Sequence, residues 1–248
     1  MVLPLVKEKG NKMDIKKMKA KARKSLKGNY LTIILVFLIY MIFNSICFVV
    51  ANIIKESAMS VFLQLIVTGL IYMGFLQIII KVARGKKAKV EELFTRTDLF
   101  WRCTALTIVF LFINVICGLL EYTAVNSLSV FLSYQAELNI LLSSFMIVIG
   151  IILSIVITVF WIVIILYFSQ SYLILYDNEE MPLKEIFEKS MDMMDGHKID
   201  YIMLCLSFIG WIILGIFTFG ILYFWLIPYI YVSLVNFYDE IKAGAEWK

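Results

Sequence analysis

Five long stretches of this 248-residue chain carry no aspartate, glutamate, lysine or arginine, and they constrain the fold more than any other feature. The stretches are residues 28–54, 57–80, 103–120, 138–176 and 201–238. A helix needs about 20 mostly apolar residues to cross the roughly 30 Å hydrocarbon core of a bilayer. Because each stretch reaches or approaches that length, the pattern indicates helices that are dissolved in lipid.

The composition agrees with a membrane environment. Apolar residues make up 62% of the chain and charged residues 17%, and the mean hydropathy is +0.89. A soluble domain is about half apolar and about a quarter charged, because polar side chains must cover its surface. We therefore expect an all-α, polytopic membrane protein.

The charge-free stretches predict six transmembrane helices within one domain of residues 29–240. The expected spans are about 30–54, 58–81, 102–120, 147–172, 201–217 and 221–238. As one helix, 138–176 would measure about 58 Å, so it is one long tilted span, two short spans that break near Gly150, or a span plus a re-entrant segment. One span is favoured, because a turn inside the hydrocarbon would leave backbone groups unpaired.

Basic residues predict the orientation, because loops rich in lysine and arginine stay in the cytoplasm. The segment 1–28 carries ten of them, and five more follow the second span. This places the N-terminus, and with six spans also the tail 241–248, on the cytoplasmic side of the plasma membrane. The weak point is 177–200, where eight acids outnumber three lysines.

Short amphipathic helices are expected along the cytoplasmic surface at 12–28, 89–100 and 182–195. In the first, Ile15, Met18, Ala22 and Leu26 form an apolar stripe among basic residues. Such a helix can rest on an anionic leaflet, or its lysines can simply set the topology. The residues expected to meet anionic lipid headgroups are Lys16, Lys17, Lys19, Arg23, Lys24 and Lys27. The acidic face of 182–195 is expected to turn towards the basic segment 7–27.

Polar residues within the spans are mainly amides and hydroxyls. Asn44 and Asn114 fall near the middle of their spans, so they could bond to each other and hold two helices together. Pro228 interrupts the sixth span by removing a backbone donor. No ionisable residue is expected at mid-membrane, and all four cysteines read as buried free thiols.

Several short motifs resemble a known family. They are Ala22-Arg23-Lys24-Ser25-Leu26-Lys27-Gly28-Asn29-Tyr30, Asp177-Asn178, Gly196-His197-Lys198, Leu206-Ser207-Phe208-Ile209-Gly210-Trp211, Trp225-Leu226, Pro228-Tyr229 and Phe237-Tyr238. In this order they resemble an uncharacterised bacterial integral membrane family, domain of unknown function 975, over about residues 20 to 240. The resemblance implies a multi-helix membrane protein and no established activity.

No pattern points to catalysis, a cofactor or a metal. His197 is the one histidine; it has no catalytic partner nearby in sequence and can be read as a helix-end residue. We expect a non-catalytic membrane scaffold, accessory or lipid-associated component. Its partners would be the bilayer, anionic headgroups and a membrane protein or second copy of the chain, not nucleic acid. The alternative is a transporter or exporter of a small molecule, lipid or peptide, with its site near Pro228 and the amide residues of the spans.

Overall fold

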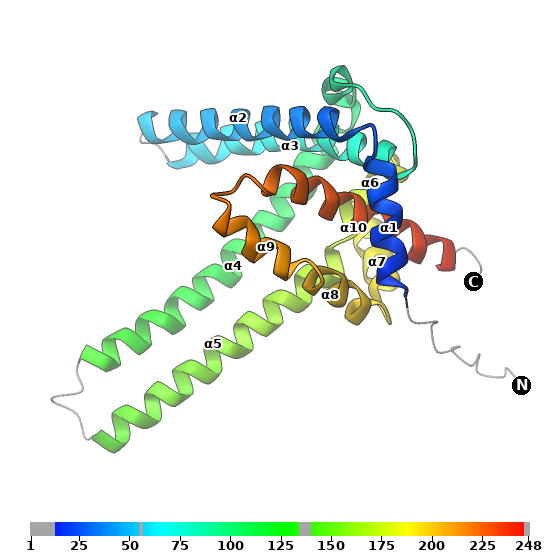
Figure 1. The fold of residues 1–248 in the computed structure, drawn as a ribbon. Coiled ribbons are helices and arrows are strands. Elements are labelled where there is room, and N and C mark those ends of the chain that lie inside the picture. The colour runs from blue at the N-terminus through cyan, green and yellow to red at the C-terminus, as the bar shows by residue number, and fades with distance from the viewer. Residues whose placement is uncertain (1–12, 55–56, 134–139, 246–248) are drawn as a thin grey trace, which may run out of the picture.

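The computed structural model describes residues 13–54, 57–133 and 140–245, and the regular elements in this part of the chain are all helices (Figure 1). In order they are α1 (Ile15–Leu26), α2 (Tyr30–Ile54), α3 (Ser57–Ala83), η1 (Val90–Phe94), η2 (Thr97–Leu99), α4 (Phe100–Ser133), α5 (Ile140–Phe168), α6 (Ser171–Asp177), α7 (Leu183–Met194), α8 (Lys198–Leu206), α9 (Ile209–Phe217) and α10 (Tyr223–Ala245). The all-α prediction is confirmed for the described residues.

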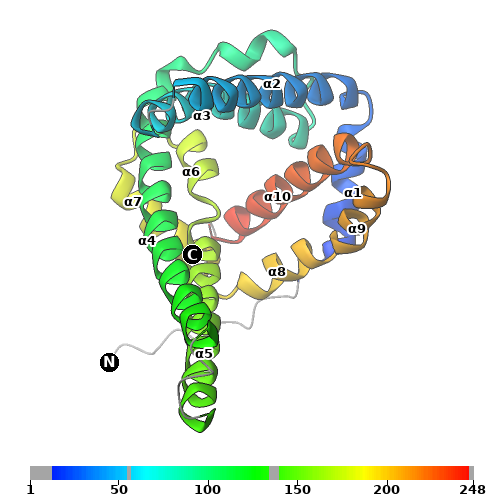
Figure 2. The same ribbon diagram turned by 90° about the vertical axis from the view of Figure 1, so that its left-hand side faces the viewer.

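The long helices form two packed antiparallel pairs, α2 with α3 and α4 with α5, while α8–α9 and α10 form a third, more open antiparallel hairpin whose α10 arm packs mainly on α1, α3 and α2. All three extend from one end of the molecule, where α1, α6 and α7 lie (Figure 1). Figure 2 shows that the α4/α5 pair projects away from the other helices, whereas α10 packs against α2 and α3. We call the shared end, formed by α1, α6, α7 and the nearby helix ends, the base.

The hydrophobic core lies mainly in the base, where the pairs converge. The C-terminal half of α3 is its centre, with Met73, Ile78, Ile79 and Ile80 at most 2% exposed. Around it pack α1, α2, α4, α10 and η1. Gly74 permits the closest approach, because a Cβ there would lie 1.7 Å from the carbonyl oxygen of Leu93 in η1.

Four helical segments of the described chain are long and apolar enough to cross a membrane, fewer than the six spans predicted. They are Tyr30–Val50, Val90–Asn126, Ser144–Asp177 and Lys198–Phe217. In α3 only Ile71–Ala83 appears, as a shorter apolar helix. In α10 the C-terminal half carries Asp239, Glu240 and Lys242. The segment Ser144–Asp177 has none of its most apolar window buried, as a helix solvated by lipid would.

Two helices differ in length from the sequence reading. α5 runs unbroken through Gly150, which supports the single-span reading over a break at that glycine. The helix that contains the predicted third span, 102–120, extends past residue 120. α4 continues to Ser133, so Glu121 and Tyr122 lie inside a helix rather than in a loop. One carboxylate interrupts the charge-free run without ending the helix, because glutamate is itself a good helix former.

The predicted fifth span, 201–217, is two helices instead of one. α8 ends at Leu206 and α9 begins at Ile209. The amide of Trp211 donates to the carbonyl of Phe208, and the carbonyl of Ser207 accepts instead from the ammonium of Lys19, at 3.0 Å. A side chain that enters the backbone ladder in this way is a known cause of helix breaks.

The turn between α9 and α10 satisfies its own backbone. The amides of Thr218, Phe219 and Gly220 all donate to carbonyls of the last turns of α9. Phe219 and Gly220 take positive φ values of 51° and 85°. The Tyr223 hydroxyl donates to a carbonyl of α9, and its ring lies against Gly215. The apex is therefore closed within itself while Phe219 is 97% exposed.

Candidate functional site

The most connected polar group of the base is the carboxylate of Asp177, at the C-terminal end of α6. The guanidinium of Arg84 donates to both of its oxygens at 2.9 Å, and the ammonium of Lys242 lies 2.7 Å from Oδ2. The hydroxyl of Tyr238 also donates to Oδ2, at 3.2 Å. Arg84 reaches Asp239 at 2.8 Å as well. We call these five residues the Asp177 cluster.

The Asp177 cluster joins three parts of the chain far apart in sequence: the end of α3, the end of α6 and the C-terminal half of α10. The side chain of Asp177 is only 8% exposed. Burial alone would raise the pKa of Asp177, but the two cations outweigh it and hold this pKa below its usual value. The same contacts raise the pKa of Arg84, so both partners stay charged and locked together.

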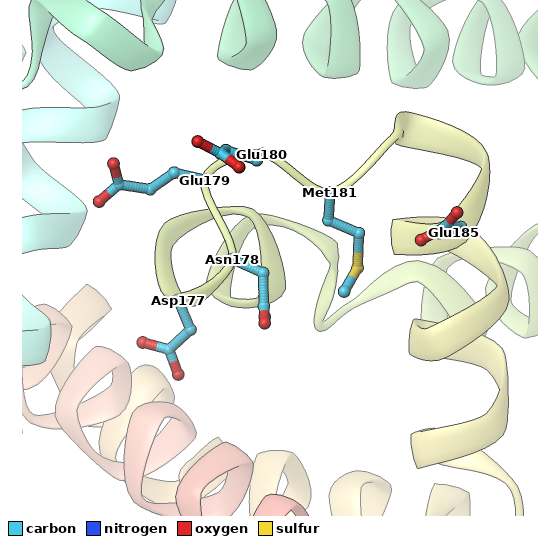
Figure 3. A pocket seen from close by; sticks show the side chains of 6 residues that line it. All are labelled: Asp177, Asn178, Glu179, Glu180, Met181 and Glu185. Atoms are coloured by element: carbon cyan, nitrogen blue, oxygen red, sulfur yellow. The ribbon is translucent and has the colours of Figure 1, made fainter.

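An acidic hollow of about 620 Å³ lies beside this cluster, between α6 and α7 (Figure 3). Asp177, Asn178, Glu179, Glu180, Met181 and Glu185 line it. Two arginines hold the loop at its rim. Arg96 pairs with Glu179 at 2.7 Å, and Arg102 donates to the carbonyls of Glu179 and Met181. In the described chain no group of three or more His, Cys, Asp or Glu side chains is arranged to hold a metal.

The basic helix α1 lies across the base rather than along a pair (Figures 1 and 2). Its carboxylate cap is Asp14, which accepts from the amide of Lys17 at 3.1 Å. Met18, Ala22 and Leu26 are buried against α10, α3 and α8, which confirms the predicted stripe. The apolar side is therefore occupied by protein.

Lys19 departs from the lipid-facing role expected of it. Its ammonium donates to the carbonyl and hydroxyl of Ser207, at 3.0 and 3.1 Å, and lies 4.2 Å from the ring centre of Phe208. Burial, with the nearby charge of Arg23, lowers the pKa of Lys19. Lys19 thus ties α1 to the break between α8 and α9.

The other expected headgroup residues are exposed on the outer side of α1. They are Lys16, Lys17, Arg23, Lys24 and Lys27. The hydroxyl of Ser25 donates to the carbonyl of Ala83 at 3.2 Å, which brings the end of α1 to the loop that carries exposed Lys86 and Lys87. We call these seven basic residues the basic surface.

The Gly196-His197-Lys198 motif forms the turn between α7 and α8. Gly196 has φ 86°, a conformation that suits glycine. His197 Nδ1 lies 3.8 Å from Asp200, too far for a hydrogen bond. The amide of His197, not its side chain, reaches the preceding helix end, at Met194. Lys198 extends to α5, where its ammonium contacts the hydroxyl and ring of Tyr167.

Asn44 and Asn114, which the sequence predicts could bond to each other, each bond to a carbonyl of their own helix. Asn44 donates to the carbonyl of Tyr40 at 2.8 Å, and Asn114 donates to that of Phe110 at 2.7 Å, each within its own helix. Pro228 lies inside α10, which continues past it. The reading of all four cysteines as buried is wrong for Cys205, which is exposed.

The predicted helix 182–195 is confirmed as α7, with Ile186, Ser190, Met193 and Met194 buried. Its main neighbours are α6, α5 and α10, whereas α1 packs mainly on α10, α3 and α8. The predicted approach of 182–195 to the basic segment is thus not one of the principal packings. The carboxylates of Glu188 and Asp195 pair instead with nearby lysines, Lys184 at 3.7 Å and Lys198 at 3.9 Å.

Comparison with known proteins gives one positive result. A family model described as "Protein of unknown function (DUF975)" matches residues 10–245. The chain belongs to the DUF975 family. Neither the curated proteins nor the solved structures contain a match to it.

The motifs that carried the DUF975 resemblance meet in the structure. Asp177 and Tyr238, from two motifs, bond to each other in the Asp177 cluster. Phe208 and Tyr229, from two others, pack ring against ring beneath Lys19, with centroids 5.2 Å apart. The spacing of these motifs along the DUF975 chain gave no signal that they would converge, and Arg84 and Asp239 lay outside them.

Proposed function

We propose that this protein is a multi-pass component of the plasma membrane that works without catalysis, as a scaffold or accessory subunit whose basic surface binds anionic lipid headgroups. The topology proposed is six membrane-embedded segments with the base and both termini on the cytoplasmic side. An even number of crossings is supported by the position of the two ends of the described chain, because α1 and the C-terminal end of α10 lie together at the base (Figure 1).

The observation that carries the lipid proposal is the two-sided character of α1. Its apolar residues are fixed against α3, α8 and α10, while Lys16, Lys17, Lys24 and Lys27 remain exposed. Because packing already holds α1 as a helix, its lysines can bind lipid phosphate groups without the entropy cost of folding the segment. Each lysine close to an anionic leaflet contributes about 1 kcal/mol.

The test is lipid selectivity of the purified protein in mixed micelles, measured by native mass spectrometry with phosphatidylglycerol against phosphatidylcholine. The variant Lys16→Gln/Lys17→Gln/Lys24→Gln/Lys27→Gln should lose the preference for the anionic lipid. The control variant Lys184→Gln, on the exposed face of α7, should keep it. Equal retention of anionic lipid by the quadruple variant and the wild type would reject a headgroup site on α1.

A second candidate function is transport, and one set of observations favours it. The α8–α9 segment is broken at Ser207, and α10 contains Pro228. Asn236 is 1% exposed, and both of its amide atoms lack hydrogen-bond partners within the described chain. Discontinuous helices with buried polar groups form the sites of many transporters.

Aqueous labelling separates the two functions. In a variant without native cysteines, Asn236→Cys should react with a small charged methanethiosulfonate if a water-filled path reaches α10. If the cysteine at position 236 does not react with the reagent while a cysteine that replaces exposed Lys17 does, the result supports the scaffold function. Reaction at position 236 would favour the transporter.

A further inference from the structure

Glu121 is the one residue with a charged side chain in an otherwise uncharged stretch of α4 from residue 103 to Ser133. The hydroxyl of Ser154 on α5 donates to its Oε1. Its Oε2 is buried and has no hydrogen-bond partner among the described residues. Leu119, Leu120 and Val125 around it on α4 are about half exposed or more, so the carboxyl lies within an apolar surface.

The position of Ser154 fixes the depth of this carboxyl. Ser154 is the central residue of α5, with 14 residues before it and 14 after it. Measured from Phe168, which lies near the Lys198–Tyr167 contact, 14 residues correspond to about 21 Å. The hydrocarbon core is about 30 Å thick. A tilt of the helix pair makes the depth smaller than about 21 Å, which is still less than the thickness of the core. Glu121 therefore lies inside the hydrocarbon.

Among the residues that the structure describes, no cation pairs with this carboxyl. α5 contributes the hydroxyl of Ser154, and residues 138–176 contain no charged residue at all. The nearest titratable groups on its own helix are Cys117 and Tyr122, and α3 carries no charged residue between 57 and 80. An isolated carboxylate in hydrocarbon is costly, and proton uptake removes that cost.

We propose that Glu121 is a proton-binding site at hydrocarbon depth, clasped by Ser154 between α4 and α5. In the protonated form, one carboxyl oxygen still accepts from the Ser154 hydroxyl and the side chain carries no charge. In the ionised form, that hydroxyl is the one donor among the described residues that stabilises the negative charge. The hydroxyl of Ser154 is thus a positioning group that favours release of the proton. The inference rests on the membrane placement of the α4/α5 pair proposed above, and a proton site would serve transport better than scaffolding.

The test uses dicyclohexylcarbodiimide, a lipid-soluble reagent that adds to protonated carboxyls, on the wild-type protein in phosphatidylcholine vesicles. Peptide mass spectrometry should find one carbodiimide adduct at Glu121, with the yield falling as the pH is raised. A water-soluble carbodiimide with glycine ethyl ester should instead modify exposed Glu185. Glu121→Gln should lose the adduct completely. Ser154→Ala should retain labelling to higher pH, and Ser154→Thr should behave as wild type.

Absence of the lipid-soluble adduct, or modification of Glu121 by the water-soluble reagent, would overturn the proposal. A lipid-phase photoreactive probe on the same vesicles separates this failure from that of the membrane placement. Labelling of Ile152, Ile155 and Val156 without an adduct at Glu121 means that the pair lies in lipid but binds no proton there. Absence of both signals means that the placement itself is wrong.

Discussion

Replacement of Asp177 by asparagine keeps the shape of the side chain and removes its charge. The variant loses the charge-assisted bonds from Arg84 at 2.9 Å and from Lys242 at 2.7 Å. Exposed ion pairs contribute little, but the Asp177 side chain is only 8% exposed. Hydrogen bonds to charged groups contribute about 1.5–3 kcal/mol each. Because Arg84 keeps Asp239 and asparagine still accepts, we expect a net loss of about 3 kcal/mol.

The assay is equilibrium unfolding in mixed micelles with increasing denaturing detergent, followed by circular dichroism, with hydrogen exchange to locate the loss. Exchange should rise in α6 and in the C-terminal half of α10, where Lys242 lies. The matched control is Asp192→Asn, an exposed carboxylate of α7. If Asp177→Asn lies within about 0.5 kcal/mol of this control, the ordinary range for surface changes, the assignment of the cluster as a structural lock is refuted.

The same group predicts a pH dependence. The pKa of Asp177 is lowered in the folded protein, so its stabilisation is fully present above the pKa of an unfolded aspartate, about 3.9. It is lost as the pH falls through the lower, folded pKa. The difference in unfolding free energy between wild type and Asp177→Asn should therefore be constant near neutral pH and shrink in acid. A difference that grew in acid would contradict this.

Three further predictions concern single contacts. Lys19→Met should cost about 2 kcal/mol, from the lost charged hydrogen bonds and ring contact, and should increase exchange at the α8–α9 break, whereas exposed Lys17→Met should not. Gly74→Ala should destabilise by several kcal/mol, because the new Cβ would meet a backbone carbonyl of η1 at 1.7 Å; Gly118→Ala, with open space around it, should be neutral or stabilising in the same unfolding assay. Gly196→Ala should cost about 1–2 kcal/mol for its left-handed backbone, and a value near zero would count against that turn.

Local features were predictable because they depend on periodicity within one segment. The stripe of α1 and the buried face of α7 follow from apolar residues at helical spacing. The single α5 follows from the cost of a turn in lipid. These readings need no knowledge of what each face packs against.

Contacts between distant segments were not predictable. Lys19 and Ser207 are 188 positions apart, and Arg84 and Asp239 are 155 apart. In sequence Lys19 is one lysine among many on α1, and only packing decides that its side chain enters the α8–α9 break. The helix through Glu121 was missed for a related reason: a lone carboxylate marks the end of a span unless its partner, Ser154, is seen beside it.

The closed turn at Thr218–Gly220 has a consequence for how this part of the chain enters the bilayer. A loop whose amides are hydrogen-bonded to water loses those bonds when it crosses the hydrocarbon, at a free-energy cost of several kcal/mol for each unpaired group. Here the amides of Thr218, Phe219 and Gly220 already donate within the turn, and the tip presents an aromatic ring. In the topology proposed above, the two arms could therefore be inserted together, with the amides of their apex already paired.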